Sequence, residues 1–347
     1  MPPDRQITDL EDLKIEATDN FEDVNELMIR LGCTDGLPIV PPTVERVARM
    51  LGGRDPRRVV AVLPPLRGLA TLRKLAICAV MAGCLPDYFP ILVAATEAVM
   101  EPQFNLFGIQ TTTGSATPLL IMNGPIVEQC GLNAGANALG PGVRSNATIG
   151  RALRLILQNI GGAIPDYTDK ATMGQPGKYT FCFAENEAAN PWQPLHVWRG
   201  CQPQQSTVTV VGAAGTLEVV DSTSVDADGV LTTMAHSMTI AGSLGGNGTL
   251  GGGEPLVLLA PEHAAIIGRE YSRQQAQDAL FAMARFPASQ LPPEKQAALG
   301  DVPADLCVAS QAADIMLVVV GGVGAKSTYV PTWGGTTKAV TRAIETV

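Results

Sequence analysis

The chain has few charged residues. Lysine, arginine, aspartate and glutamate make up 16% of its 347 residues, against about 25% in an average soluble protein. A chain with so little charge often covers part of its surface in an assembly, so we expect a homo-oligomer. The charges that are present sum to −9, from 24 basic and 33 acidic side chains. Since an acidic chain without a basic cluster repels a phosphate backbone, we expect no nucleic-acid partner.

Long hydrophobic runs are also missing. No apolar stretch reaches the roughly 18–20 residues that are needed to cross a bilayer. The opening segment, MPPDRQITDLEDLKIEAT, is polar and acidic, and it has neither the basic region nor the apolar region of a signal peptide. We therefore expect a cytoplasmic protein with no membrane partner.

The chain has few histidines, and its cysteines show no paired spacing. The three histidines show no HxH or HxxxH spacing, so we expect no metal site. The seven cysteines are odd in number and scattered, and no CxxC occurs. This pattern argues against a disulfide framework and against a zinc ribbon. The absence of GxSxG argues against the α/β-hydrolase class.

Two glycine-rich segments do not match known cofactor motifs. Residues 321–328 are GGVGAKST, but Ala325 stands where a phosphate-binding loop requires glycine. Residues 245–253 precede an expected strand instead of following one, which favours a lid or close backbone packing over a dinucleotide fingerprint. The cofactor is therefore unknown from the sequence.

Alternating strands and helices predict an α/β fold. We expect two packed α/β units with mixed sheets, at residues 1–205 and 206–347. Residues 118–132 and 255–269 share the order strand, proline turn and short helix, which suggests a pseudo-repeat. The main strands are expected at residues 58–63, 107–112, 119–123, 207–211, 256–259 and 315–320. The main helices are expected at residues 69–81, 90–99, 147–160 and 231–244.

The most informative segment is residues 137–161, which contains the expected helix at 147–160. A loop rich in glycine and proline precedes an amphipathic helix, and Asn146 stands at the expected N-cap. A helix start offers free N–H groups and a partial positive charge, so it suits a small anion. Arg144 and Arg151 lie within reach to bind a carboxylate or a phosphate. The alternative is ordinary capping with surface arginines.

Four further polar residues are candidates for substrate contacts. Lys178 in GQPGKYTF is placed to hold an anion. Lys326 and Ser327 follow an expected buried strand, the position at which α/β proteins bind ligands. Asp35 in TDGLP is either a substrate contact or a turn-forming residue.

Two cysteines, a histidine and a glutamate are the candidate catalytic residues. Cys84 lies at an expected helix end, and Cys182 stands near Glu185 in KYTFCFAENE. A nucleophilic cysteine requires a lowered pKa and a nearby base. His196, in a long irregular segment, and Glu185 are the alternatives for that base. The alternative for each of these residues is a structural role.

Several motifs together resemble one protein family. TDGLPIVPPT at residues 34–43, NATIGRALRL at 146–155 and GQPGKYTFCFAENE at 174–187 are similar to an uncharacterised bacterial family, the UGSC-like proteins. The resemblance covers most of the chain and implies thiol or selenol redox chemistry. The sequence CGSC does not occur in this chain.

These observations predict an enzyme that acts on a small anionic metabolite, as a lyase or hydrolase that uses a cysteine or a general base. A thiol redox protein is the first alternative, and it requires a cysteine with a lowered pKa. A non-catalytic small-molecule binding protein is the second, and it requires a pocket without perturbed titratable groups.

Overall fold

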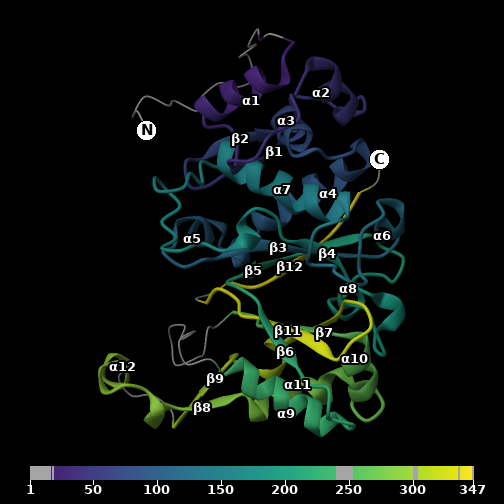
Figure 1. Ribbon diagram of the computed structural model, residues 1–347, viewed down its shortest axis with the longest axis vertical. Helices are drawn as coiled ribbons and strands as arrows, with labels where there is room; N and C mark the ends of the chain where they lie inside the picture. The colour runs from purple at the N-terminus through teal and green to yellow at the C-terminus, as the bar shows by residue number, and fades with distance from the viewer. Residues whose placement is uncertain (1–16, 18, 240–252, 300–303, 335–336, 346–347) are drawn as a thin grey trace.

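The chain folds into four layers, in which two mixed sheets pack together and helices cover their outer faces (Figure 1). The computed structural model describes residues 17, 19–239, 253–299, 304–334 and 337–345. The first sheet is covered by α3 (Leu72–Ala82), α4 (Phe89–Val99) and α7 (Arg144–Asn159). The second is covered by α9 (Ala227–Met238), α10 (Pro261–Gly268) and α11 (Arg273–Met283). The predicted α/β class with mixed sheets is confirmed.

The first sheet joins strands that are far apart in the sequence. Its order is β12 (Val340–Ala343), β5 (Thr207–Ala213), β3 (Thr117–Asn123) and β4 (Cys182–Ala184). β3 and β4 are parallel, and the other neighbours are antiparallel. The predicted boundary at residue 206 therefore does not separate the two sheets, because β5 and β12 complete the first one.

The second sheet has the same pattern of pairing. Its order is β10 (Met316–Val319), β7 (Leu256–Leu259), β11 (Lys326–Val330) and β6 (Leu217–Val220). β10 and β7 are parallel, and β11 is antiparallel to both of its neighbours. Both sheets thus place a parallel pair at one edge and antiparallel strands beyond it. The suggested pseudo-repeat of the two units stays a prediction.

Strand alternation gives each sheet two buried faces. In β3, Leu120 and Met122 pack with the first helix layer, while Leu119 and Ile121 pack with side chains of the second sheet. β7 alternates in the same way and contributes Leu258 to the core between the sheets. Since successive side chains of a strand point to opposite faces, each central strand connects two of the three cores.

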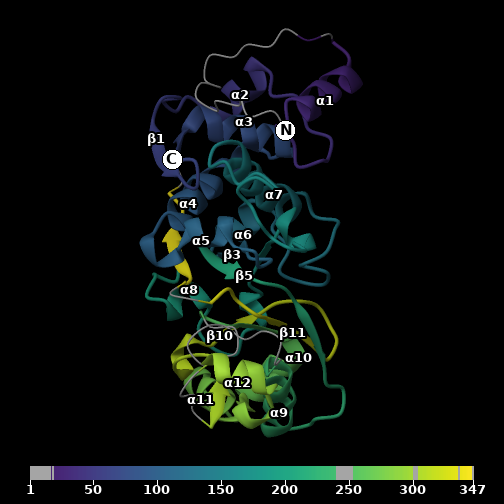
Figure 2. The ribbon, with the colours of Figure 1, turned by 90° about the vertical axis from the view of Figure 1, so that its left-hand side faces the viewer.

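The remaining elements surround these layers. Two helices, α1 (Phe21–Arg30) and α2 (Val44–Leu51), lie at the end of the molecule nearest the first helix layer (Figure 2). The short elements are β1 (Val59–Leu63), β2 (Gly68–Thr71), α5 (Leu106–Thr111), α6 (Ile126–Gln129), α8 (Leu195–Trp198), β8 (Arg285–Pro287), α12 (Pro293–Leu299) and β9 (Asp305–Cys307). β1 and β2 form an antiparallel hairpin.

Most predicted strands are confirmed, and one is wrong. The strands expected at 58–63, 119–123, 207–211, 256–259 and 315–320 are β1, β3, β5, β7 and β10.

The segment expected as a strand at residues 107–112 instead forms helix α5. Asn105 adopts a left-handed backbone with φ of 54°, and its side chain accepts a hydrogen bond from the N–H of Gly108, which starts the helix. The glycine-rich loop expected at 245–253 lies outside the described residues up to residue 252.

Side chains on the polar face of α7 bind the segment that precedes α2. Nε and Nη2 of Arg151 donate to the two carboxylate oxygens of Asp35, at 2.7 and 2.8 Å. Nη2 also donates to the carbonyl of Pro38 at 2.9 Å. Gln158 donates to the carbonyl of Thr34 at 2.8 Å. The side chains of Arg151 and Asp35 are both mostly buried. Removing either one would therefore leave the charge of the other buried without an ionic partner.

Replacing Asp35 by alanine is expected to lower the free energy of unfolding by about 3 kcal/mol, because Arg151 then loses its carboxylate. Urea unfolding followed by circular dichroism measures this loss. Asp278→Ala removes an exposed aspartate from α11, and this control is expected to stay within about 0.5 kcal/mol of the wild type. An equal loss in both variants would contradict the role of the ion pair.

Candidate functional site

Strand ends of the two sheets meet in one region. Asn186, shortly after β4, donates its backbone N–H to the carbonyl of Val319 in β10 at 2.7 Å. Gly321, after β10, donates to the carbonyl of Ala134 at 2.9 Å. Ligands of α/β proteins bind beyond the carboxyl ends of strands. This strand-end region is therefore where a site is expected.

Five polar side chains in this region form what we call the carboxylate–histidine cluster: Asn123, Glu185, Glu187, Asn190 and His196. Asn123 is the last residue of β3, and the others follow β4. Nδ2 of Asn123 donates to Oε2 of Glu185 at 2.6 Å and to Oε1 of Glu187 at 2.9 Å. The parallel pairing of β3 with β4 brings these residues together.

Glu185 is a buried carboxyl group, 2% exposed. It also accepts hydrogen bonds from the N–H of Leu195 and from Nδ2 of Asn190, both at 2.7 Å. Burial raises the pKa of Glu185, and the hydrogen bonds and nearby Arg273 offset only part of that effect. The carboxyl group therefore holds its proton to a higher pH than an ordinary glutamate.

Glu187 and His196 differ in exposure. The side chain of Glu187 is 30% exposed, and its Oε1 accepts a hydrogen bond from the N–H of Gly124 at 2.8 Å. His196 is fully buried, with Nδ1 at 3.9 Å from Oε1 of Glu187 and Nε2 at 3.4 Å from the carbonyl of Pro203. Because a carbonyl oxygen only accepts, Nε2 is the donor in this contact, and Nδ1 is the ring nitrogen that lies toward Glu187.

Two buried atoms of the cluster have no hydrogen-bond partner among the described residues, Nδ1 of His196 and Oδ1 of Asn123. Buried polar atoms of this kind are uncommon, and a catalytic role is one physical explanation for them. They lie in a cluster with a buried acid, Glu185, and a carboxylate open to solvent, Glu187. Such an arrangement can take up and release a proton.

The structure at the start of α7 differs from the anion site that the sequence predicted. The helix begins at Arg144 with Val143 as N-cap, so Asn146 is not the N-cap. Asn146 is buried in the first turn, where Oδ1 accepts from the N–H of Asn133 at 2.8 Å and Nδ2 donates to its carbonyl at 3.0 Å. The amide thus holds the loop before α7, because it can match both a donor and an acceptor of the backbone.

The two arginines of that predicted site are bound within the protein. Nε and Nη2 of Arg144 donate to the carbonyl of Gly83 at 3.0 and 2.8 Å. Arg151 binds Asp35, so these two predicted substrate contacts bind each other instead. Arg144 is still exposed and is the member of this group that is open to a ligand.

Lys178 likewise has a partner inside the chain. Its Nζ donates to both carboxylate oxygens of Asp169, at 2.8 and 2.7 Å, and Arg154 lies 3.4 Å from the same carboxylate. Burial lowers the pKa of Lys178, and Asp169 offsets part of this effect. Lys178 therefore serves as a counter-ion in a small ionic network beside α7.

The two candidate cysteines are buried. Sγ of Cys84 donates to the carbonyl of Thr148 at 3.3 Å, and burial raises the pKa of Cys84 to about 12. Cys182 lies in β4, and burial raises its pKa as well. A nucleophilic thiol requires access and a lowered pKa. These surroundings are therefore unfavourable to the catalytic role that was predicted.

Lys326 and Ser327 begin β11 but have different surroundings. Lys326 is exposed, whereas Ser327 is buried. Oγ of Ser327 accepts from the N–H of Ala260 at 3.0 Å and lies 2.7 Å from Nδ1 of His263. Nε2 of His263 donates to the carbonyl of Asp221 at 2.9 Å. Ser327 thus binds the start of α10, and Lys326 is the member of the pair that is open to a ligand.

The structure brings together two of the four predicted catalytic residues, Glu185 and His196. Asn123, Glu187 and Asn190 were not among the predicted site residues. A signal existed for Asn123, because it ends a predicted strand, and α/β proteins place ligand contacts there. No comparable signal marks Glu187, since β4 is a strand of three residues and shows no periodicity.

Comparison with known proteins assigns no family. No protein-family model matches the chain, and no curated protein matches it. Within the described ranges, no group of three or more His, Cys, Asp and Glu side chains is arranged to hold a metal ion. In the same part of the chain, no helix combines the length and the apolar composition needed to cross a membrane.

The raised pKa of Glu185 predicts a pH dependence of stability. The folded chain holds this proton more tightly than the unfolded chain does. The contribution of Glu185 to stability is thus complete below the ordinary glutamate pKa and is lost as the pH rises through the raised value. Urea unfolding at a series of pH values measures this slope. We expect Glu185→Gln to remove it and Glu128→Gln, on an exposed position of α6, to retain it; an unchanged slope in Glu185→Gln would contradict the raised pKa.

The buried thiols predict slow labelling by iodoacetamide. In the native protein, Cys84 and Cys182 are expected to react only when the structure opens, whereas the half-buried Cys33 and Cys201 are labelled earlier. Mass spectrometry of the peptides gives the order of labelling. Rapid labelling of Cys84 at neutral pH would contradict this expectation and would support the thiol redox alternative.

Proposed function

We propose that the protein is a cytoplasmic enzyme that transfers a proton in a lyase or hydrolase reaction of a small anionic metabolite, at the carboxylate–histidine cluster. One observation carries the proposal: a buried acid, Glu185, and a partly exposed carboxylate, Glu187, bind the same amide, Asn123. When the environments of two carboxyl groups differ in this way, one can donate a proton while the other accepts one.

Glu187 is the general base in this proposal, because it is the acidic member of the cluster that solvent reaches. It accepts a proton from a substrate carbon or from an attacking water. In this proposal the proton then passes to Nδ1 of His196, 3.9 Å from Oε1 of Glu187. Glu185, whose pKa is raised by burial, supplies a proton to the leaving group.

An anionic substrate has to keep its charge away from the carboxylates of the cluster. Two exposed cations support the anionic class. Lys326 begins β11 at the edge where its antiparallel neighbour β7 ends. Arg144 begins α7, which Asn146 connects to the loop at Asn133. We assign the substrate's charged group to these two side chains.

The cytoplasmic location and the homo-oligomer are parts of the same proposal. All seven cysteines are free thiols, which supports a reducing compartment. The hairpin of β1 and β2 exposes four large apolar side chains, between 43% and 50% each, at Val59, Val62, Leu66 and Leu69. Exposed apolar patches are typical of protein contacts, which supports assembly.

Proton nuclear magnetic resonance in D2O tests the proposed function. The protein is incubated with small carboxylic acids that have acidic C–H bonds and with carboxylates that carry an ester or amide bond. Proton abstraction replaces a C–H signal by deuterium, and hydrolysis produces new signals. We expect a member of the panel to react, and Glu187→Gln to slow that reaction by about 100-fold or more, as loss of a general base does.

Glu128→Gln is the matched control and is expected to react at the wild-type rate. The wild-type rate is expected to fall as the pH rises through the raised pKa of Glu185, because the acid is then ionised. No reaction with any member of the panel would favour the non-catalytic binding protein. A reaction that Glu187→Gln leaves unchanged would place the chemistry outside the cluster.

A further inference from the structure

Arg273, the first residue of α11, is almost fully buried, 6% exposed. Its guanidinium lies over two indole rings, 5.6 Å from the centre of the Trp192 ring and 5.5 Å from that of Trp198. Nη2 donates to the carbonyl of Gln193 at 2.7 Å, and Nη1 donates to a carbonyl of β10 at 2.5 Å. Contacts between a cation and an aromatic face are strongest away from water. Arg273 therefore holds residues 190–198, which we call the tryptophan segment, against the second sheet.

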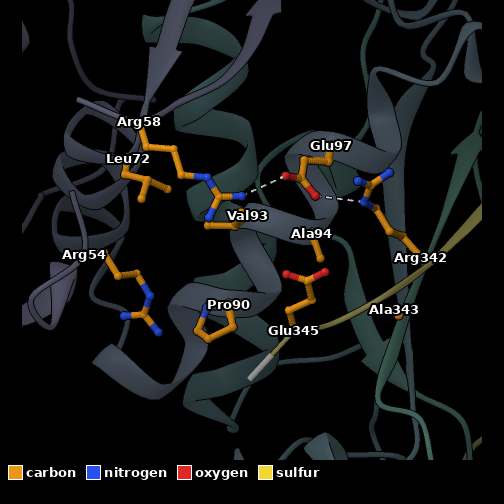
Figure 3. A pocket seen from close by; sticks show the side chains of 10 residues that line it. All are labelled: Arg54, Arg58, Leu72, Pro90, Val93, Ala94, Glu97, Arg342, Ala343 and Glu345. Carbon is orange, nitrogen blue, oxygen red and sulfur yellow. Dashed lines mark hydrogen bonds and ion pairs between the residues drawn. The ribbon is translucent and has the colours of Figure 1, made fainter. Parts of the chain in front are cut away.

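The charge of Arg273 has an unusual environment for an arginine of this chain. Figure 3 shows a more common arrangement, in which Nε of Arg342 donates to Oε2 of Glu97 at 2.8 Å and Arg58 approaches the same carboxylate to 3.5 Å. Within the described ranges, no carboxylate forms an ion pair with Arg273. Burial lowers the pKa of Arg273, and the negative charge of Glu185 opposes this effect. Glu185 is thus an acidic group with which Arg273 interacts without a direct ion pair.

The tryptophan segment also supplies two of the hydrogen bonds that Glu185 accepts. Oδ1 of Asn190 accepts from the N–H of Trp192 at 2.9 Å, which leaves Nδ2 of the same amide to donate to Oε1 of Glu185. The N–H of Leu195, between the two tryptophans, donates to Oε2 of Glu185 at 2.7 Å. A shift of the tryptophan segment would therefore withdraw both donors from the carboxyl group.

We propose that Arg273 is a positioning residue for Glu185, because it holds the tryptophan segment where the two N–H donors of that segment reach the carboxyl group. Its positive charge acts in the same direction, since charge and donors both favour the ionised form. The other titratable groups beside Glu185 are Glu187, which shares the amide of Asn123, and His196, which lies next to Glu187. The use of the Glu185 proton in a reaction rests on the proposed function, whereas the positioning does not.

Carbon-13 nuclear magnetic resonance of protein labelled at the glutamate δ-carbon tests the proposal without a substrate. The Glu185 signal is the one that is absent from Glu185→Gln, and its chemical shift follows the titration of the carboxyl group. In Arg273→Gln, the carboxyl group is expected to hold its proton about tenfold more tightly, because it loses a positive charge and its ordered donors. A merely loosened fold would admit water and lower the pKa of Glu185. An unchanged or a lowered titration would therefore overturn the proposal.

Two further variants separate the parts of this role. Arg273→Lys keeps the charge and carries the lower risk to folding, but an ammonium group lacks the planar fork that binds both carbonyls. It is expected to shift the Glu185 titration in the same direction by a smaller factor, and a wild-type titration would overturn the positioning role. Arg269→Gln, which removes an exposed arginine at the end of α10, is the control and should titrate like the wild type.

The same variants keep this inference separate from the proposed function. If a member of the carboxylic acid panel reacts, the fall of the rate with pH is expected to move to higher pH in Arg273→Gln, by the same factor as the Glu185 titration. A shifted titration with no reaction of any panel member would support the positioning role and count against the proposed function. A reaction that depends on Glu187, together with an unshifted titration, would support the function and overturn the positioning role.

Discussion

The face-to-face packing of the two mixed sheets is the contact on which the other layers depend. Side chains from β3, β4 and β5 meet side chains from β7, β10 and β11 in one buried core. A shift of any of these strands by one residue would exchange its two faces and place the wrong side chains between the sheets. The register is therefore strongly constrained. As a consequence, β4 and β10 end side by side, and Asn186 can bind Val319.

Much of this framework could be predicted from the sequence, because buried strands are apolar runs between turns. β3, β5, β7 and β10 were recognisable on that basis. β4 was not, since three residues are too few for a pattern. The same gap explains the incomplete site prediction. Glu185 and His196 were candidates as polar residues of an irregular segment, but the hydrogen bond of Glu185 with Asn123 depends on the pairing of β3 with β4, which local sequence does not show.

Two of the side chains that were predicted to bind an anion beside α7 have carboxylate partners within the chain. Arg151 and Lys178 do bind carboxylates, but these belong to Asp35 and Asp169 of the same chain. A side chain that suits a ligand's carboxylate suits an aspartate equally well. Residue type and spacing cannot distinguish the two cases, because the aspartates are distant in sequence or separated by an irregular loop.

The hydrogen bonds of the carboxylate–histidine cluster restrict the class of ligand that it can bind. The amide of Asn123 must turn its N–H groups toward Glu185 and Glu187, because the opposite orientation would set its oxygen against a carboxylate. Its Oδ1 therefore has no donor among the described residues, and Nδ1 of His196 has no hydrogen-bond partner there either. Under the proposed function both atoms act as acceptors. In that function, a ligand that completes the site brings a hydroxyl, an amine or a water next to them. An attacking water that satisfies these acceptors would then also be the source of the proton that Glu187 removes in a hydrolysis.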